Sequence, residues 1–156
     1  MVRRSNLFHM VLLVVILLGA LVASAQATSP ATKRRFIKLP GAGAPLPFSD
    51  AVLVGGTLYL GGHLGLEPKT GRAPEDIDRE VRLLMDSMQA TLAAAEMTTD
   101  DLVWVQVSCS DIALYDQFNA IYRTYFKKEF PARAFLGSGT LLRGAHFEVL
   151  GIAIKR

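Results

Sequence analysis

Residues 47–71 read PFSDAVLVGGTLYLGGHLGLEPKTG, and this stretch decides how the fold begins. Two short apolar runs, 51–54 and 57–60, flank the pair Gly55-Gly56. Because two adjacent glycines can both adopt positive φ, this arrangement predicts a β-hairpin. A second pair, Gly61-Gly62, predicts either the end of the second strand or a place where another backbone or a ligand approaches closely.

The period of the apolar residues changes after Pro74. They recur every three or four positions to about Met97, which predicts one long amphipathic helix. Alternation over 102–109 then predicts a strand with two different faces. One face holds Val103, Val105, Val107 and Cys109, and the other holds Leu102, Trp104, Gln106 and Ser108.

A second helix is predicted to begin at Ser110 or Asp111 and to end before Pro131. Its buried side would carry Leu114, Phe118, Ile121, Tyr122, Tyr125 and Phe126. Strands are predicted at 36–39, 133–136 and 147–154. The order strand, strand, strand, helix, strand, helix, strand, strand predicts an α+β fold, in which both helices pack on one face of a mixed sheet.

The first 25 residues predict a secretory signal peptide. Arg3 and Arg4 precede an uncharged apolar stretch, 10–23, which as a helix covers about 21 Å, less than the roughly 30 Å core of a membrane. Small residues at 23–27 then offer a cleavage site. We expect a periplasmic or secreted protein without stable membrane association after cleavage; an uncleaved amino-terminal anchor is the alternative. Residues 26–40 would form a flexible leader and first strand, and 41–156 the folded domain.

Composition excludes several classes of protein. With 51% hydrophobic and 20% charged residues the chain is a packed globule, and its single cysteine, Cys109, allows no intramolecular disulfide. Without residues 1–25 it carries 15 basic and 14 acidic residues, which disfavours binding to nucleic acid. His63 and His146 have no ligand neighbours at metal-binding spacing, so neither a metal nor a cofactor is predicted. Cys109, on an apolar strand face, is predicted to be a buried, unreactive thiol.

Two charged residues stand among apolar neighbours of the last two strands, Arg133 at 133–136 and Glu148 at 147–154. Such charges are costly unless they are paired, solvated or bound to a ligand. One interpretation is a salt bridge between the two at a strand edge. The other is that the Arg133 guanidinium binds a small carboxylate, with Glu148 beside a water molecule.

Four motifs in order now become informative: residues 47–71, FNAIYRTYF (118–126), FPARAF (130–135) and FEVLGIAI (147–154). Together they resemble the RidA (YjgF-like) family of reactive-intermediate deaminases, from about Pro47 to the end of the chain. The resemblance implies a chorismate-mutase-like α+β protomer. It also implies a homotrimer whose sheets form a central barrel, with ligand clefts between subunits.

The resemblance further implies a reaction, the cofactor-free hydrolysis of 2-imino acids to 2-keto acids and ammonia. In that reaction Arg133 would hold the substrate carboxylate, Glu148 would act on the water, and Asn119 would lie in the cleft. The remaining cleft positions depart from the family pattern. Phe48 stands for a tyrosine, Gly61 for a serine, His63 for a glutamine and Phe135 for a cysteine, which implies a less polar substrate-binding pocket.

Export leaves a second function open. The imines that this family removes arise mainly in the cytoplasm, so an exported member must meet another source of imine or act differently. The alternative is a trimeric protein that binds small carboxylates without turnover. Ribonuclease or translation-inhibitor activity fits poorly with a mature net charge near zero.

Overall fold

The computed structural model describes residues 33–40 and 46–156. The predicted signal peptide and residues 26–32 of the leader lie outside the described residues. Within the described ranges, none of the helices is both long and apolar enough to cross a membrane.

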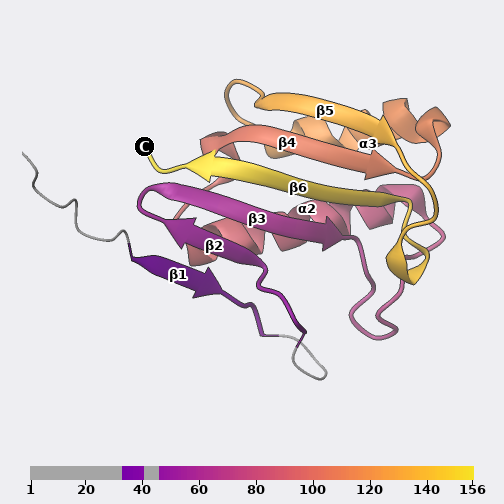
Figure 1. The fold of residues 1–156 in the computed structure, drawn as a ribbon. Coiled ribbons are helices and arrows are strands. Elements are labelled where there is room, and N and C mark those ends of the chain that lie inside the picture. Colours follow the sequence, from indigo (N-terminus) through magenta and orange to yellow (C-terminus); the bar gives the residue numbers. More distant parts are fainter. Residues whose placement is uncertain (1–32, 41–45) are drawn as a thin grey trace, which may run out of the picture. The chain divides into compact units, whose positions relative to one another are not determined.

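A sheet of six strands forms the framework, in the order β1-β2-β3-β6-β4-β5 (Figure 1). Every neighbouring pair is antiparallel except β4 and β5, which run parallel. The strands are β1 (Arg34–Ile37), β2 (Ala51–Val54), β3 (Thr57–Leu64), β4 (Leu102–Cys109), β5 (Ala132–Gly137) and β6 (Phe147–Ile154). The predicted α+β fold with a mixed sheet is confirmed, although the first strand lies two residues earlier than predicted.

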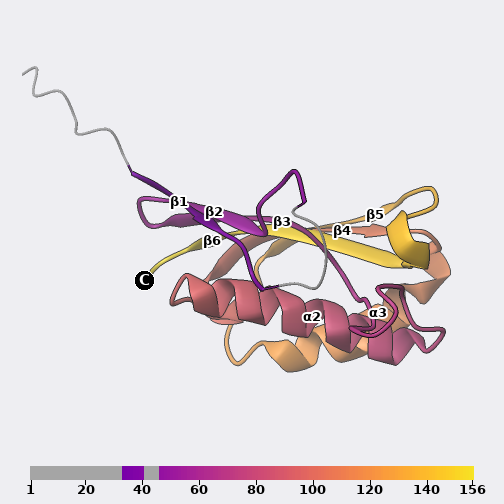
Figure 2. The ribbon, with the colours of Figure 1, turned by 90° about the horizontal axis from the view of Figure 1, so that it is seen from below.

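Two helices, α2 (Ile77–Ala94) and α3 (Tyr115–Tyr122), cover one face of this sheet (Figure 2). The α2 helix is shorter than the predicted 74–97. It begins after Asp76, whose carboxylate accepts hydrogen bonds from the backbone N–H groups of Asp78 (3.0 Å) and Arg79 (3.3 Å). This cap satisfies two of the donors that an α-helix leaves free at its start, so Pro74 stays outside.

The predicted second helix is divided into three pieces. Asp111 caps a 3₁₀ turn, Ile112–Leu114, by accepting from the Ala113 backbone N–H at 2.9 Å. The α3 helix follows, and a second 3₁₀ turn, Arg123–Tyr125, ends the segment. The crossover through α3 allows β5 to lie parallel to β4, because parallel neighbours need such a connection.

The hydrophobic core lies between the helices and the sheet. Its fully buried large side chains come from both layers: Leu58, Val81, Leu84, Met85, Met88, Leu92, Val105, Val107, Phe118, Phe147 and Val149. Cys109 is buried in this core, as predicted, and burial raises the pKa of its thiol. A buried thiol with a raised pKa is a poor nucleophile.

Two strand irregularities change which residues face the helices. In β4 the register against β6 shifts between Leu102 and Trp104, so Leu102 is buried and Val103 is 42% exposed. The predicted faces of these two residues are therefore wrong, because a bulge inserts one residue and reverses the alternation. In β3 a shift falls between Leu60 and His63, and the strand continues through Gly61-Gly62 to Leu64.

Candidate functional site

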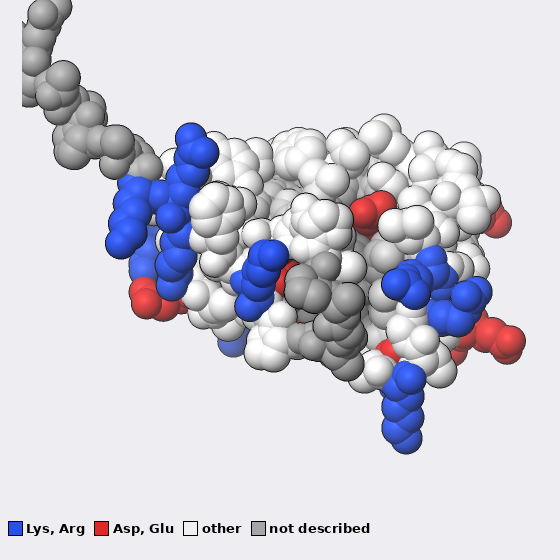
Figure 3. Space-filling model, turned by 60° about the horizontal axis from the view of Figure 1, so that its bottom comes forward, with Lys and Arg blue, Asp and Glu red and all other residues white. Residues whose placement is uncertain are grey.

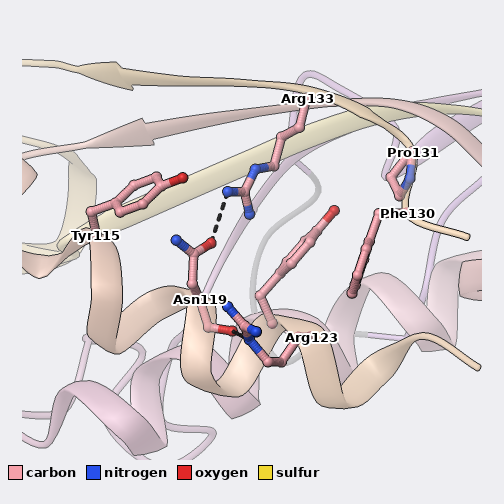
Figure 4. Close-up of a pocket in the computed structure, with 7 residues that line it drawn as sticks. Tyr115, Asn119, Arg123, Phe130, Pro131 and Arg133 are labelled. Carbon is pink, nitrogen blue, oxygen red and sulfur yellow. Dashed lines mark hydrogen bonds between the residues drawn. The ribbon is translucent and has the colours of Figure 1, made fainter.

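Arg133 occupies the last strand of the sheet, β5. It pairs with Val105 of β4, and its side chain lies on the face that the helices cover. The guanidinium Nη2 donates a hydrogen bond of 2.7 Å to Oδ1 of Asn119 on α3 (Figure 4). The crossover therefore brings together two residues that are 14 positions apart, Asn119 of FNAIY and Arg133 of FPARAF.

Aromatic rings surround the Arg133 guanidinium. Its Cζ lies 4.7 Å from the ring centroid of Tyr122 and 5.7 Å from that of Phe135. Tyr115 and Phe118 follow at 5.9 Å each. These contacts hold the cation electrostatically without neutralising it, so its charge is still available to an anion.

A pocket of about 270 Å³ opens beside this cation. Arg133 and Asn119 line it together with Tyr115, Tyr122, Arg123, Phe130 and Pro131 (Figure 4). Arg123 is held in place by a hydrogen bond of 3.1 Å from its Nε to the carbonyl of Asn119. A small pocket with two arginines suits the carboxylate of a small molecule, because Arg binds a carboxylate with two parallel hydrogen bonds.

Glu148 lies on the opposite face of the sheet from Arg133. Its neighbours in β6, Phe147 and Val149, are fully buried against the helices, so alternation turns Glu148 to the uncovered face. It pairs with Ser108, and β4 separates its strand from β5. Strands β5 and β6 are therefore not neighbours in the sheet, and the predicted salt bridge between Arg133 and Glu148 is wrong. The hydrogen-bond partner of Arg133 is Asn119.

The glycine pair of β3 makes room for the Glu148 carboxylate. A Cβ built at position 62 would overlap Glu148 Oε1. The amide of Gly61 donates to the carbonyl of Asp50 at 2.8 Å. Of the two predicted roles for this pair, close approach is thus the one observed, and the approaching group is an acidic side chain.

The other predicted cleft residues are dispersed. The ring of Phe135 lies beside the Arg133 guanidinium. It packs edge-on against the ring of Tyr115, with the two centroids 4.9 Å apart. Phe48 is exposed in the loop before β2, and neither Phe48 nor Gly61 lines the pocket. His63 contradicts its predicted place in the cleft. Its side chain is only 5% exposed and points to the helix-covered face, where its Nδ1 lies 2.9 Å from Ser87 Oγ of α2. Burial lowers the pKa of His63 to about 4.

Sequence reasoning missed Glu80, a carboxylate of α2 with no exposure at all. It accepts hydrogen bonds from the backbone N–H groups of His146 (2.6 Å) and Phe147 (3.1 Å), and its Oε2 lies 2.7 Å from His146 Nδ1. Glu80 thereby ties α2 to the start of β6. Its place next to Val81, inside the apolar period of the predicted helix, was the available signal.

The prediction that Tyr122 is buried in the core is confirmed, and this residue also lines the pocket. Sequence reasoning gave no role to Tyr115, Arg123 and Phe130, which line it as well. The spacing of Tyr115, Asn119 and Tyr122 along one helix face was the signal for this wall. Among residues 33–40 and 46–156, no group of three His, Cys, Asp or Glu side chains is placed to hold a metal ion.

Comparison with known proteins agrees with this architecture. The family model Endoribonuclease L-PSP matches residues 41–155. A RutC family protein of Aquifex aeolicus is 34% identical over 124 residues, which cover 78% of this chain and 99% of that protein. The human protein named 2-iminobutanoate/2-iminopropanoate deaminase is 34% identical over 119 residues, covering 76% of this chain and 85% of its own.

A solved structure shows the same fold. The Yersinia pestis protein YyfA, described as a protein of unknown function of the conserved Rid family, superposes with a TM-score of 0.72 at 31% identity. The match covers 78% of this chain and 99% of that one. This chain therefore belongs to the endoribonuclease L-PSP family, and its predicted membership of the RidA (YjgF-like) family is confirmed.

Proposed function

We propose that this protein hydrolyses 2-imino acids to 2-keto acids and ammonia in clefts between copies of the chain. The observation that carries the proposal is the Arg133 pocket, where a cation held by Asn119 and aromatic rings opens on a cavity sized for a small carboxylate. Relatives that are 33–34% identical and named 2-iminobutanoate/2-iminopropanoate deaminase support it.

The first step is capture of the substrate by its acid group. The hydrogen bond to Asn119 engages one side of the guanidinium and leaves N–H groups for a carboxylate. Charge-assisted hydrogen bonds of this kind contribute about 1.5–3 kcal/mol, roughly ten- to a hundredfold in affinity. The electrophilic imine carbon, one bond from the carboxylate, is thereby held at a fixed place.

The second step needs a base, and a second copy of the chain supplies it. Glu148 cannot reach the Arg133 pocket of its own chain, because the two lie on opposite faces of the sheet. The uncovered face also exposes Tyr59 (50%) and Ile154 (48%), apolar surface that another copy would bury. In a homotrimer, Glu148 of one copy meets Arg133 of the next.

In such a cleft the reaction balances without a cofactor. Water adds to the carbon of the protonated imine while the Glu148 carboxylate accepts a proton from it, which gives a neutral amino alcohol. Glu148 then returns this proton to the amino nitrogen, the C–N bond breaks, and ammonia leaves while the hydroxyl gives up its proton to it and becomes the keto group. A carboxylate base positioned in this way contributes typically 10²–10⁴-fold to the rate.

Mixing two inactive variants tests this arrangement. Arg133→Ala and Glu148→Gln are each expected to lose most imine hydrolysis, measured as ammonia release from imines generated in situ by an amino-acid oxidase. Refolded together in equal amounts, they should regain about a quarter of wild-type activity, because one cleft in four receives both native side chains. A mixture no more active than its components would refute the shared cleft.

A trimeric binding protein for small carboxylates is the second candidate. It is favoured by the apolar substitutions Phe48 and Phe135 and by the absence of an acid among the residues lining the described pocket. If wild type hydrolyses imines no faster than Arg133→Ala, this candidate takes precedence. Calorimetric titration with 2-ketobutyrate or benzoate then separates binding from inertness, and light scattering should give the mass of three chains.

Cleavage of RNA is a weaker proposal. The face drawn in Figure 3 carries Lys and Arg in separate groups divided by uncharged surface, not in one continuous stripe. A backbone-tracking interface needs a continuous basic path for the phosphates.

Export rests on the amino-terminal sequence alone. The arginines, the apolar stretch and the small residues at 23–27 support a cleaved signal peptide. Mass spectrometry of the protein from culture medium or periplasm should show an amino terminus near Gln26 or Thr28. An intact Met1 would indicate an anchor instead.

A further inference from the structure

We infer that the Tyr122 hydroxyl is a second donor for the acid group of the ligand bound at Arg133, held without a partner until the ligand arrives. This inference rests on the proposed function, since the ligand is the carboxylate that the Arg133 pocket would bind. It gives a binding role to the tyrosine of the FNAIY motif on α3, which the sequence predicted only as a buried residue.

The first observation is an unsatisfied polar group. Tyr122 is only 4% exposed, and its hydroxyl has no hydrogen-bond partner among the described residues. Buried hydroxyls are almost always hydrogen-bonded, because leaving one without a partner forfeits the bonds it made to water. Such a group in a native fold calls for an explanation, and a missing ligand is one.

The second observation is the position of Tyr122 at the pocket, beside Arg133. Tyr122 lines the pocket, and the Arg133 guanidinium lies over its ring at 4.7 Å. Asn119 on the same wall is already engaged, its Oδ1 by Arg133 and its carbonyl by Arg123. We expect a carboxylate that draws the guanidinium toward itself to uncover the Tyr122 side chain, whose ring the guanidinium covers.

The protonation state fits a donor. Burial raises the pKa of Tyr122 to about 12, although the Arg133 cation and its close contact with the hydroxyl act in the opposite direction. The phenol therefore keeps its proton at neutral pH, and it can donate to an anion but cannot itself act as a base. The ligand class that satisfies both groups is a small monocarboxylate, whose two oxygens accept from the guanidinium while one of them also accepts from the phenol.

The substitution Tyr122→Phe tests this, because it removes the hydroxyl and keeps the ring against Arg133. Titration with 2-ketobutyrate and with benzoate should show affinity reduced about tenfold relative to wild type. The melting temperature of the ligand-free variant should rise, because an unpaired buried polar group is gone. A residue with a merely structural role would not weaken binding while stabilising the free protein.

Tyr125→Phe is the matched control. The Tyr125 hydroxyl donates to Asp86 Oδ1 at 2.8 Å and does not line the pocket. Its removal should lower the melting temperature and leave both affinities unchanged.

Equal affinities for wild type and Tyr122→Phe would overturn the inference and leave the proposed function standing. If wild type binds neither ligand and hydrolyses no imine, the proposed function fails and the inference fails with it.

Discussion

The two faces of the sheet differ in how far a single chain completes them. On the covered face Leu58, Val107 and Val149 have no exposure. Glu80, the one fully buried acid among the described residues, has three hydrogen bonds there. On the other face Tyr59 and Ile154 are about half exposed.

The two charged residues of the proposed site are also divided between the two faces of the sheet. Arg133 lies on the covered side at the edge, and Glu148 on the uncovered side in a central strand. One chain is thus sufficient for a core and insufficient for the proposed reaction. Stability and activity should therefore respond to different substitutions. The following predictions concern Glu80, His63 and the pair Gly65 and Gly62, from the largest expected effect on stability to the smallest.

Glu80→Ala should be the most damaging change on the covered side. It leaves the backbone N–H groups of His146 and Phe147 buried without their acceptor, which costs about 3–5 kcal/mol of unfolding free energy. Urea unfolding measures this, with exposed Glu75→Ala as the control and Glu80→Gln, which keeps an acceptor, as the intermediate case. A loss of unfolding free energy no greater than that of Glu75→Ala would show that Glu80 does not stabilise the covered face.

His63 should make the covered side sensitive to acid. Burial lowers its pKa to about 4 in the folded protein, below the ordinary value of 6.5. The unfolded chain therefore binds the proton first. The stabilisation is complete above pH 6.5 and is lost as the pH falls to 4, by up to about 3 kcal/mol.

His63→Gln should flatten this part of the stability curve. The difference between wild type and variant reports His63, because the carboxylates that titrate in this range are common to both. Parallel curves between pH 7 and pH 4 would show that the ring is not buried neutral.

Substitutions at two nearby glycines, Gly65 and Gly62, allow a direct comparison of the two faces of the sheet. A Cβ at Gly65 would overlap the backbone carbonyl of Glu80, whereas at Gly62 it would overlap only the side chain of Glu148. Gly65→Ala should therefore lose about 1–3 kcal/mol of stability. Gly62→Ala should keep most of its stability and lose imine hydrolysis, by about tenfold if the carboxylate is displaced. Equal stability losses would mean that both positions are structural.

Local patterns predicted much of this fold. The Gly55-Gly56 turn, in which Gly55 has a φ of 60°, joins the predicted hairpin, and the apolar period located α2. The bulge at Leu102 was not predictable, because an inserted residue changes the faces of a strand without changing its composition. The role of Asp76 as the cap of α2 emerged only from the geometry.

Two residues of the candidate site, Arg133 and Asn119, were named from the sequence, whereas the arrangement of the site was not predicted. The motifs FPARAF and FNAIY identified Arg133 and Asn119, which the fold joins at 2.7 Å. The last two strands are consecutive in the sequence, which suggested that they pair. Instead β6 enters between β3 and β4, and this depends on long-range contacts that no local window contains.

The position of β5 at the margin of the sheet has a consequence for its motions. Strands with a single neighbour open locally at lower free energy than central ones, so their amide protons exchange sooner with solvent. The cation proposed to capture the ligand thus lies on one of the two edge strands, β1 being the other. Occupancy of the pocket should slow deuterium uptake there more than in β6, which is clamped from both sides.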